Sequence, residues 1–157
     1  MMSKTRKKGP VVAKKVMHNG VTFASGLEKY MYIALKNAKI DFEYEGETFE
    51  LLPTFNNDNE CYERQSNGKG DFINRGCKKV LNIKYTPDFI GEDFVIETKG
   101  RANESFPLRW KMFKYLMRLM NDKRILYKPQ SNRECDTTVE LILKNRKNDK
   151  KETNSRR

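Results

Sequence analysis

The chain has 157 residues, the length of a single domain able to bury a substantial core. Charged residues make up 34% and hydrophobic residues 37%, and no run of eighteen apolar residues occurs, so no membrane-spanning helix is expected. The basic N-terminus lacks the apolar stretch of a secretory signal. A zinc site is not expected either, because the three cysteines form no C-x-x-C motif and the sequence has a single histidine. We therefore expect a cytoplasmic protein in a reducing compartment, with no membrane partner.

The formal net charge of +11 is concentrated at the two ends of the chain. Residues 1–20 hold six basic and no acidic residues, and residues 144–157 hold seven basic and two acidic ones, which leaves nineteen of each sign in between. We interpret 1–20 as a flexible basic arm, 21–143 as the folded domain and 144–157 as a basic tail. Basic ends on a neutral body favour a polyanionic partner, nucleic acid first, although solubilising tails are the simpler alternative.

The first predicted element is a helix at about 25–38, where apolar residues recur at steps of three and four. Ser25 and Glu28 have the spacing of a capping box, with the serine at the N-cap and the glutamate at N3. Glu28 is therefore either a helix cap or a third acidic residue of a metal site, and the spacing leaves both open.

Next, Ile40 to Glu45 alternates apolar and acidic residues, which predicts a strand whose apolar side faces the core, continuing through residue 52. Glu43 lies on its outer, acidic side. Residues 54–79 are rich in asparagine and glycine and are interpreted as an insertion, either a long loop or a small excursion between strands. A strand then begins near Val80.

Two apolar runs, 85–89 and 94–100, are predicted to form a hairpin around a turn at 91–93. Alternation places Glu97 and Lys99 on one side of their strand, with Asp88 across from them on its neighbour. Two carboxylates and an ammonium held close together are unfavourable unless they are paired. A divalent cation such as Mg²⁺, which prefers oxygen ligands, would offset the repulsion between the two carboxylates. A surface hairpin with a Glu–Lys pair is the alternative.

After a loop that contains Arg101, a helix is predicted from about Pro107 to Asn121, capped by Ser105. Its core-facing stripe is expected to be Leu108, Met112, Tyr115, Leu116, Leu119 and Met120. Arg109, Lys111 and Lys114 then form either a solvated basic face or a contact to a phosphate backbone. A short strand at 125–127 and an apolar segment at 139–143, strand or helix, complete a mixed α/β or α+β sheet flanked by helices.

The pair P-D, a gap of eight residues and E-x-K resembles the signature of the PD-(D/E)xK nucleases. Four blocks in order resemble the bacteriophage endonuclease I family, the Holliday-junction resolvases of the T-odd phages. These blocks are Ser25–Glu28, Phe42–Glu45, Tyr85–Phe89 and Val95–Gly100. The resemblance covers about residues 20–100, and the turn-rich insertion departs from the family pattern.

The resemblance implies a restriction-endonuclease-like fold and a Mg²⁺-dependent endodeoxyribonuclease, with Mn²⁺ able to substitute. It implies that Asp88 and Glu97 bind the metal with help from Glu28, that Lys99 positions or deprotonates the attacking water, and that Glu43 lies near the site. It further implies a homodimer that cleaves branched DNA, such as a four-way junction, to 5′-phosphate products in a host-cell cytoplasm. Candidate DNA contacts are Lys4, Arg6, Lys7, Lys8, Lys14, Lys15, Arg101, Arg109, Lys111 and Lys114. Another nuclease of this superfamily acting on linear duplex, and a non-catalytic basic DNA-binding protein, are the alternatives.

Overall fold

The computed structural model describes residues 14–101 and 105–155, and the chain divides into two compact units. The first unit comprises Met1–Tyr44, Asp88–Arg101 and Arg124–Arg157, and the second comprises Glu45–Pro87 and Ala102–Lys123. The chain therefore passes from one unit to the other repeatedly, which its length did not indicate. Among the described residues, no helix is long and apolar enough to cross a membrane.

The first unit begins with a hairpin of β1 (Val16–His18) and β2 (Val21–Phe23). Its turn residues Asn19 and Gly20 have positive φ angles of 48° and 79°, as a two-residue hairpin turn requires. Residues 14–20, which the sequence analysis assigned to the flexible arm, instead belong to this hairpin or lead directly into it. The Asn-Gly pair is the local signal for this turn.

Helix α1 spans Gly26–Asn37 and confirms the predicted helix. The Ser25 hydroxyl accepts a hydrogen bond from the Glu28 backbone N–H at 3.1 Å, which satisfies one of the unpaired donors at the helix start. The buried side of α1 carries Glu28, Met31 and Leu35.

A four-stranded sheet forms the centre of the first unit, in the order β12-β11-β10-β3. Its strands are β3 (Glu43–Tyr44), β10 (Phe89–Ile90), β11 (Phe94–Ile96) and β12 (Ile125–Tyr127). The β3–β10 and β10–β11 pairs are antiparallel and the β11–β12 pair is parallel, so the sheet is mixed and the coarse α+β class is confirmed.

The predicted hairpin is present but shorter than expected, because β10 begins only at Phe89, β11 ends at Ile96, and Tyr85 belongs to β9, a strand of the second unit. Its turn is closed by a hydrogen bond from the Gly91 N–H to the Phe94 carbonyl at 3.0 Å. The strand predicted from Ile40 onward is shorter than expected. It ends at Tyr44 because Glu45 has a φ of 49°, outside the β region, so the predicted continuation through residue 52 is wrong.

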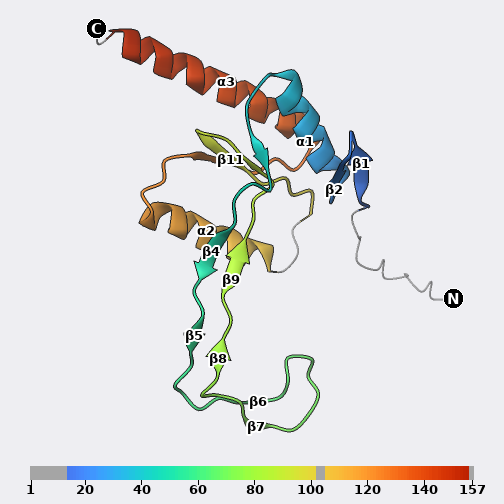
Figure 1. Cartoon of the computed structure of the whole chain (residues 1–157), viewed down its shortest axis with the longest axis vertical. Helices are drawn as coiled ribbons and strands as arrows, with labels where there is room; N and C mark the ends of the chain where they lie inside the picture. The colour runs from blue at the N-terminus through green and yellow to red at the C-terminus, as the bar shows by residue number, and fades with distance from the viewer. Residues whose placement is uncertain (1–13, 102–104, 156–157) are drawn as a thin grey trace, which may run out of the picture. The chain divides into compact units, whose positions relative to one another are not determined.

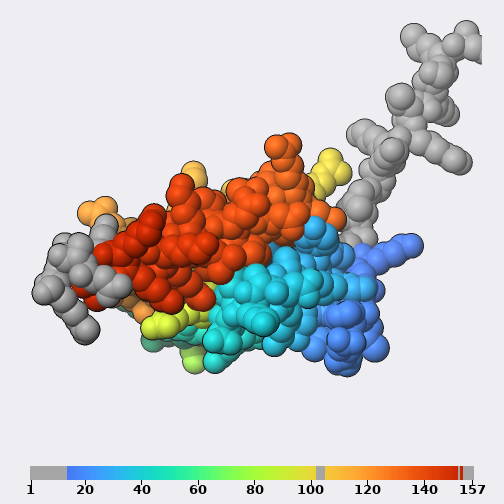
Figure 2. Space-filling view, turned by 90° about the horizontal axis from the view of Figure 1, so that it is seen from above, coloured from blue at the N-terminus to red at the C-terminus, as the bar shows by residue number. Residues whose placement is uncertain are grey.

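Helix α3 (Asn132–Ser155) lies beside α1 in both views of the molecule (Figures 1 and 2). Cys135 and Ile142 of α3 join Met31, Leu35 and the sheet residues Phe89, Phe94 and Ile96 in one buried cluster. Residues 144–155, expected to be a separate basic tail, instead continue α3. Arg146 is anchored to the β10–β11 turn by hydrogen bonds of 2.9 and 2.6 Å to the two carboxylate oxygens of Asp93.

The second unit contains a two-stranded antiparallel ribbon made of three successive strand pairs (Figure 1). The pairs are β4 (Phe49–Leu52) with β9 (Ile83–Tyr85), β5 (Phe55–Asn56) with β8 (Lys79–Val80), and β6 (Tyr62–Glu63) with β7 (Ile73–Asn74). The turn-rich insertion at 54–79 is therefore a paired ribbon and not an unpaired loop.

Helix α2 (Phe106–Leu119) packs on the β4–β9 end of the ribbon through aromatic rings. The Phe113 ring lies 4.9 Å from Phe49 and 4.8 Å from Tyr85, measured between centroids. Ser105 occupies the N-cap position, but its side chain makes no capping hydrogen bond.

The predicted core-facing stripe of α2 is wrong. The buried residues are Phe106, Trp110, Phe113 and Met117, whereas Leu108, Tyr115, Leu119 and Met120 are all more than half exposed. Two apolar stripes with helical spacing lie on opposite sides of this helix. The stripe rich in aromatic residues is buried, in keeping with the larger apolar area that such rings remove from water.

Candidate active site

Asp88 and Glu97 lie at the same end of the β10–β11 hairpin. Asp88 directly precedes Phe89, and Glu97 directly follows Ile96, the residue that pairs with Phe89 in the sheet. Because Phe89 and Ile96 are fully buried on one side of the sheet, alternation directs the two carboxylates toward the other side. The Glu97 side chain is buried, and Asp88 is partly buried.

Thr98 fixes the Asp88 carboxylate. Its backbone N–H and its hydroxyl both donate to Asp88 Oδ2, each at 2.6 Å, and Thr98 itself is buried. Sequence reasoning missed this residue. The signal was present, because a hydroxyl side chain between the glutamate and the lysine of the E-x-K motif can donate to a carboxylate on the adjacent strand.

The surroundings of Asp88 disfavour its charged form. Burial, together with the negative charge of Glu97 and a smaller contribution from Glu28, raises the pKa of Asp88 to about 8. The two hydrogen bonds from Thr98 act in the opposite direction but do not cancel this effect. A cation bound beside Asp88 and Glu97 would reverse it, because an opposite charge favours the carboxylate.

Lys99 lies close to this carboxylate pair. Its Nζ atom is 4.0 Å from Glu97 Oε1, and its side chain is 29% exposed, so it is accessible from solvent. Beyond the end of β11, the Glu97 N–H donates to the Tyr127 carbonyl and the Lys99 N–H to the Pro129 carbonyl, each at 3.0 Å. These bonds hold the E-T-K segment against the chain that follows β12.

Glu28 makes the helix cap, one of the two roles that the sequence left open. Its Oε2 atom accepts hydrogen bonds from the Ala24 N–H at 2.9 Å and from the Tyr44 hydroxyl at 3.0 Å, and Ser25 Oγ donates to Oε1 at 3.3 Å. The cap is therefore made. The negative charge of Glu28 also contributes, less than burial and Glu97 do, to the raised pKa of Asp88.

The start of α3 has a similar helix cap, which serves as a comparison for Glu28. There the Ser131 hydroxyl accepts from the Glu134 N–H at 3.3 Å, and Glu134 Oε2 accepts from the Gln130 N–H at 2.7 Å, as Glu28 does from Ala24. Glu134 is exposed. Burial, the bond from Tyr44 and the electrostatic effect on Asp88 therefore distinguish Glu28 from an ordinary cap.

The remaining candidate residues are placed as follows. Glu43 is exposed on β3, opposite Ile90 in the sheet register. Lys14 and Lys15 are exposed just before β1, and Arg101 is exposed after the hairpin. On α2 in the second unit, the candidate residues Arg109, Lys111 and Lys114 are all exposed. The predicted DNA contacts that lie outside the described residues are Lys4, Arg6, Lys7 and Lys8.

The described residues contain no group of three or more His, Cys, Asp or Glu side chains that could by itself hold a metal ion. Mg²⁺ does not require one, since proteins often hold it through one or two carboxylates and leave the other positions to water and phosphate oxygens. The three cysteines are free thiols, and burial raises the pKa of Cys135 to about 12, so this thiol stays protonated and belongs to the core.

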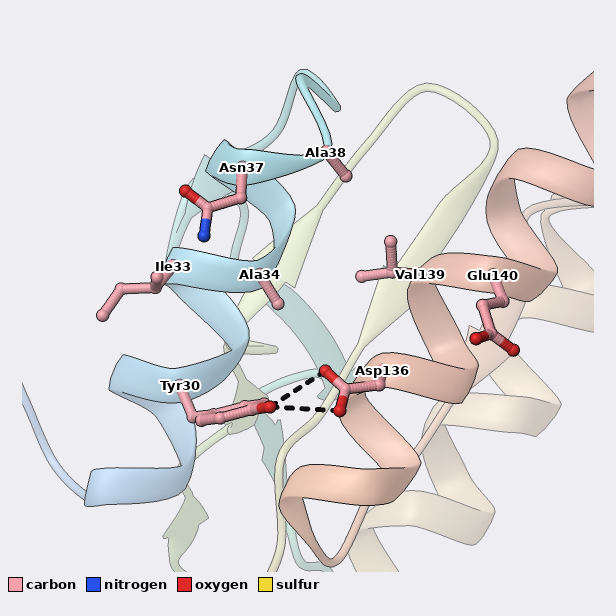
Figure 3. Close-up of a pocket in the computed structure, with 8 residues that line it drawn as sticks. All are labelled: Tyr30, Ile33, Ala34, Asn37, Ala38, Asp136, Val139 and Glu140. Carbon is pink, nitrogen blue, oxygen red and sulfur yellow. Dashed lines mark hydrogen bonds between the residues drawn. The ribbon is translucent and has the colours of Figure 1, made fainter.

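A groove of about 480 Å³ lies between α1 and α3 (Figure 3), and neither Asp88 nor Glu97 is among the residues that line it. The Tyr30 hydroxyl donates to both Asp136 carboxylate oxygens, at 3.0 and 3.1 Å, and this bond raises the pKa of Tyr30. Ala34 and Val139 supply apolar surface, and Glu140 adds a second carboxylate. An apolar groove with two carboxylates does not suit a phosphate, so we interpret the Tyr30–Asp136 pair as a link between the two helices.

These features define the class of the protein as α+β, with a mixed sheet that carries two carboxylates and a lysine at the end of one hairpin. The chain belongs to the family described as Protein of unknown function (DUF1064), whose profile matches residues 8–132. That stretch contains Glu28, Asp88, Glu97 and Lys99 and ends where α3 begins. No curated protein and no solved structure shows a significant match to the chain.

Proposed function

We propose that the protein is a Mg²⁺-dependent endodeoxyribonuclease of the PD-(D/E)xK type, with a restriction-endonuclease-like core. The observation that supports this most strongly is that Asp88, Glu97 and Lys99 converge at one end of the β10–β11 hairpin, although eight residues lie between the two acids along the chain. The order of the four sequence blocks gives independent support.

The donor set at this hairpin end suits Mg²⁺. Asp88 and Glu97 offer carboxylate oxygens, and the unfavourable charge on Asp88 is the kind that a divalent cation offsets. When bound, Mg²⁺ lowers the pKa of water and stabilises negative charge on a phosphate. Glu28 adds a third negative charge nearby and is proposed to assist in holding the metal.

Side chains of the protein are proposed to orient the metal ligand and the attacking water. Thr98 holds one oxygen of Asp88 with two hydrogen bonds, so that the carboxylate keeps its orientation. Lys99 is close to Glu97 and accessible to solvent, and it is proposed to orient the attacking water or to remove its proton. Attack at phosphorus and departure of the 3′-oxygen would leave a 5′-phosphate.

The narrower proposal concerns the substrate. The resemblance to the endonuclease I family favours branched DNA cut by a homodimer with two active sites, and the concentration of positive charge at the chain ends favours a polyanion. A nuclease of the same superfamily that acts on linear duplex shares the chemistry and differs only in the substrate.

The test is a cleavage assay with the full-length protein on a four-way junction and a matched linear duplex, each with Mg²⁺ or with EDTA. Wild-type protein should cut the junction only with Mg²⁺, Glu97→Gln should not cut, and Glu140→Gln, an exposed carboxylate on α3, should cut normally. Equal cleavage of both DNAs would replace the junction proposal with the linear-duplex alternative. Cleavage by Glu97→Gln at the wild-type rate, or DNA binding without any cleavage, would overturn the nuclease proposal.

A further inference from the structure

The ribbon of the second unit exposes large apolar side chains along a segment that has no core of its own. From residue 53 to residue 82 no side chain is buried. The exposed fractions of the large apolar residues are Phe55 44%, Tyr62 56%, Phe72 67%, Ile73 48%, Val80 37% and Leu81 71%. Apolar surface gathered in this way on a soluble protein indicates an interaction site.

The end of the ribbon is nevertheless held together by hydrogen bonds between side chains and the backbone. Asn74 Oδ1 accepts hydrogen bonds from the backbone N–H groups of Cys61 at 3.1 Å and Gly76 at 2.9 Å. Arg75 donates to the carbonyls of Glu63 at 3.1 Å and Asp71 at 3.3 Å. These bonds between side chain and backbone hold the two strands together without burying apolar residues, so the exposed rings are available to a partner.

One side of the β6–β7 pair carries two rings and a guanidinium. In the register, Tyr62 pairs with Asn74 and Glu63 with Ile73. Because side chains alternate, Tyr62 and Arg64 share a side with Asn74 and Phe72, and Glu63 and Ile73 lie on the other. The Tyr62 and Phe72 rings are 6.2 Å apart between centroids and inclined by 40°. We name Tyr62, Arg64 and Phe72 the aromatic face.

We propose that the aromatic face binds a nucleic-acid strand by stacking on its unpaired bases. Aromatic rings stack on any base, and an arginine beside them can stack or pair with a phosphate. Arg64 gives the aromatic face a positive charge, and Glu63 lies on the opposite side of the strand pair, so the face suits a polyanion although residues 53–82 as a whole hold five basic and four acidic residues. The inference rests on the proposed function in taking DNA as the partner, and it adds a second surface that contributes no group to the chemistry.

The same charge disfavours the other occupant that such a surface could take, a second copy of the chain. A symmetric contact centred on the aromatic face would bring the same patch of both copies together and would place Arg64 of one copy near Arg64 of the other. Like charges placed across an interface weaken the association. A single strand brings phosphates to Arg64 and bases to the rings.

The test uses the full-length protein and fluorescence anisotropy, with a labelled single-stranded DNA oligonucleotide and its matched duplex as probes, in EDTA to prevent cleavage. The double variant Tyr62→Ala/Phe72→Ala should bind the single strand about 10–100-fold more weakly, given the usual contribution of one stacked ring per base. The double variant Tyr62→Phe/Phe72→Tyr, which keeps both rings, should bind normally. So should Ile73→Ala, which removes an exposed apolar side chain from the opposite side of the same strand pair.

Unchanged thermal unfolding and far-UV circular dichroism would show that each variant folds. Wild-type affinity in the alanine double variant, an equal loss in Ile73→Ala, or an equal loss for single strand and duplex would overturn the inference. So would self-association of the wild type that the alanine double variant loses. If the wild type cuts DNA but the alanine variant binds normally, only this inference fails. If the rings prove necessary for binding and no DNA is cut, only the nuclease proposal fails.

Discussion

The replacement Asp88→Asn tests the electrostatics of the carboxylate pair through protein stability alone. The folded protein raises the pKa of Asp88 from 3.8 to about 8, so the folded state holds a proton that the unfolded state releases. Between these two values, the free energy of unfolding of the wild type falls as the pH rises, by about 1.4 kcal/mol per pH unit. An asparagine oxygen can still accept the hydrogen bonds from Thr98 but cannot ionise.

We therefore expect Asp88→Asn and the wild type to have similar stability below about pH 4, where Asp88 is protonated in both the folded and the unfolded state, and the variant to be more stable by about 4 kcal/mol near pH 7. The assay is urea unfolding in EDTA at several pH values between these limits. Glu140→Gln, which changes an exposed carboxylate on α3, is the control and should follow the wild type at every pH. If the free energies of unfolding of Asp88→Asn and the wild type change in parallel with pH across this range, the pKa of Asp88 is not raised and the electrostatic reasoning is refuted.

Three further changes test other parts of the molecule. Lys99→Gln should slow DNA cleavage about 100-fold or more while metal binding is kept, and equal rates in single-turnover assays would remove Lys99 from the mechanism. Gly76→Ala should weaken the ribbon, because a Cβ there would collide with the backbone carbonyl oxygen of Asn59; faster proteolysis of the ribbon is the readout, and an unchanged rate would contradict it. Arg146→Met should lower stability by about 0.5–1 kcal/mol, a modest value because Arg146 and Asp93 are each about a third exposed. Since Arg146 lowers the pKa of Asp93, this difference in stability should shrink as the pH falls below about 4 and vanish below the lowered pKa of Asp93, and a difference that persists in stronger acid would contradict it.

Elements whose signals are local could be predicted from the sequence. Helix α1 follows from Ser25 and the apolar residues behind it, and the β10–β11 hairpin from two apolar runs around a glycine turn. The same capping pattern at Ser131 and Glu134 marks the start of α3. Local signals of this kind act through hydrogen bonds between residues three or four apart, so the sequence displays them directly.

The parts that escaped prediction depend on contacts between distant residues. The ribbon at 54–79 consists of two-residue strands held by the side chains of Asn74 and Arg75, and no apolar alternation marks it. On α2 two apolar stripes compete, and the choice between them is made by Phe49 and Tyr85, which lie far away in the sequence.

The candidate site divides in the same way. Asp88, Glu97 and Lys99 could be grouped in advance because they belong to one predicted hairpin. The Tyr44 hydroxyl on Glu28 could not be foreseen, because the alternating pattern of residues 40–45 indicated only that Tyr44 faces the core. The Thr98 bonds to Asp88 link adjacent strands of that hairpin, so they could have been inferred but were overlooked.

The most direct test of the central claim, that Asp88 and Glu97 together hold a divalent cation, is a calorimetric titration with Mg²⁺ or Mn²⁺ at neutral pH. Wild-type protein should bind the metal and release protons, because Asp88 must ionise to act as a ligand. Binding should be lost in both Asp88→Asn and Glu97→Gln and kept in Glu140→Gln. Metal affinity that is unchanged in both site variants would contradict the account.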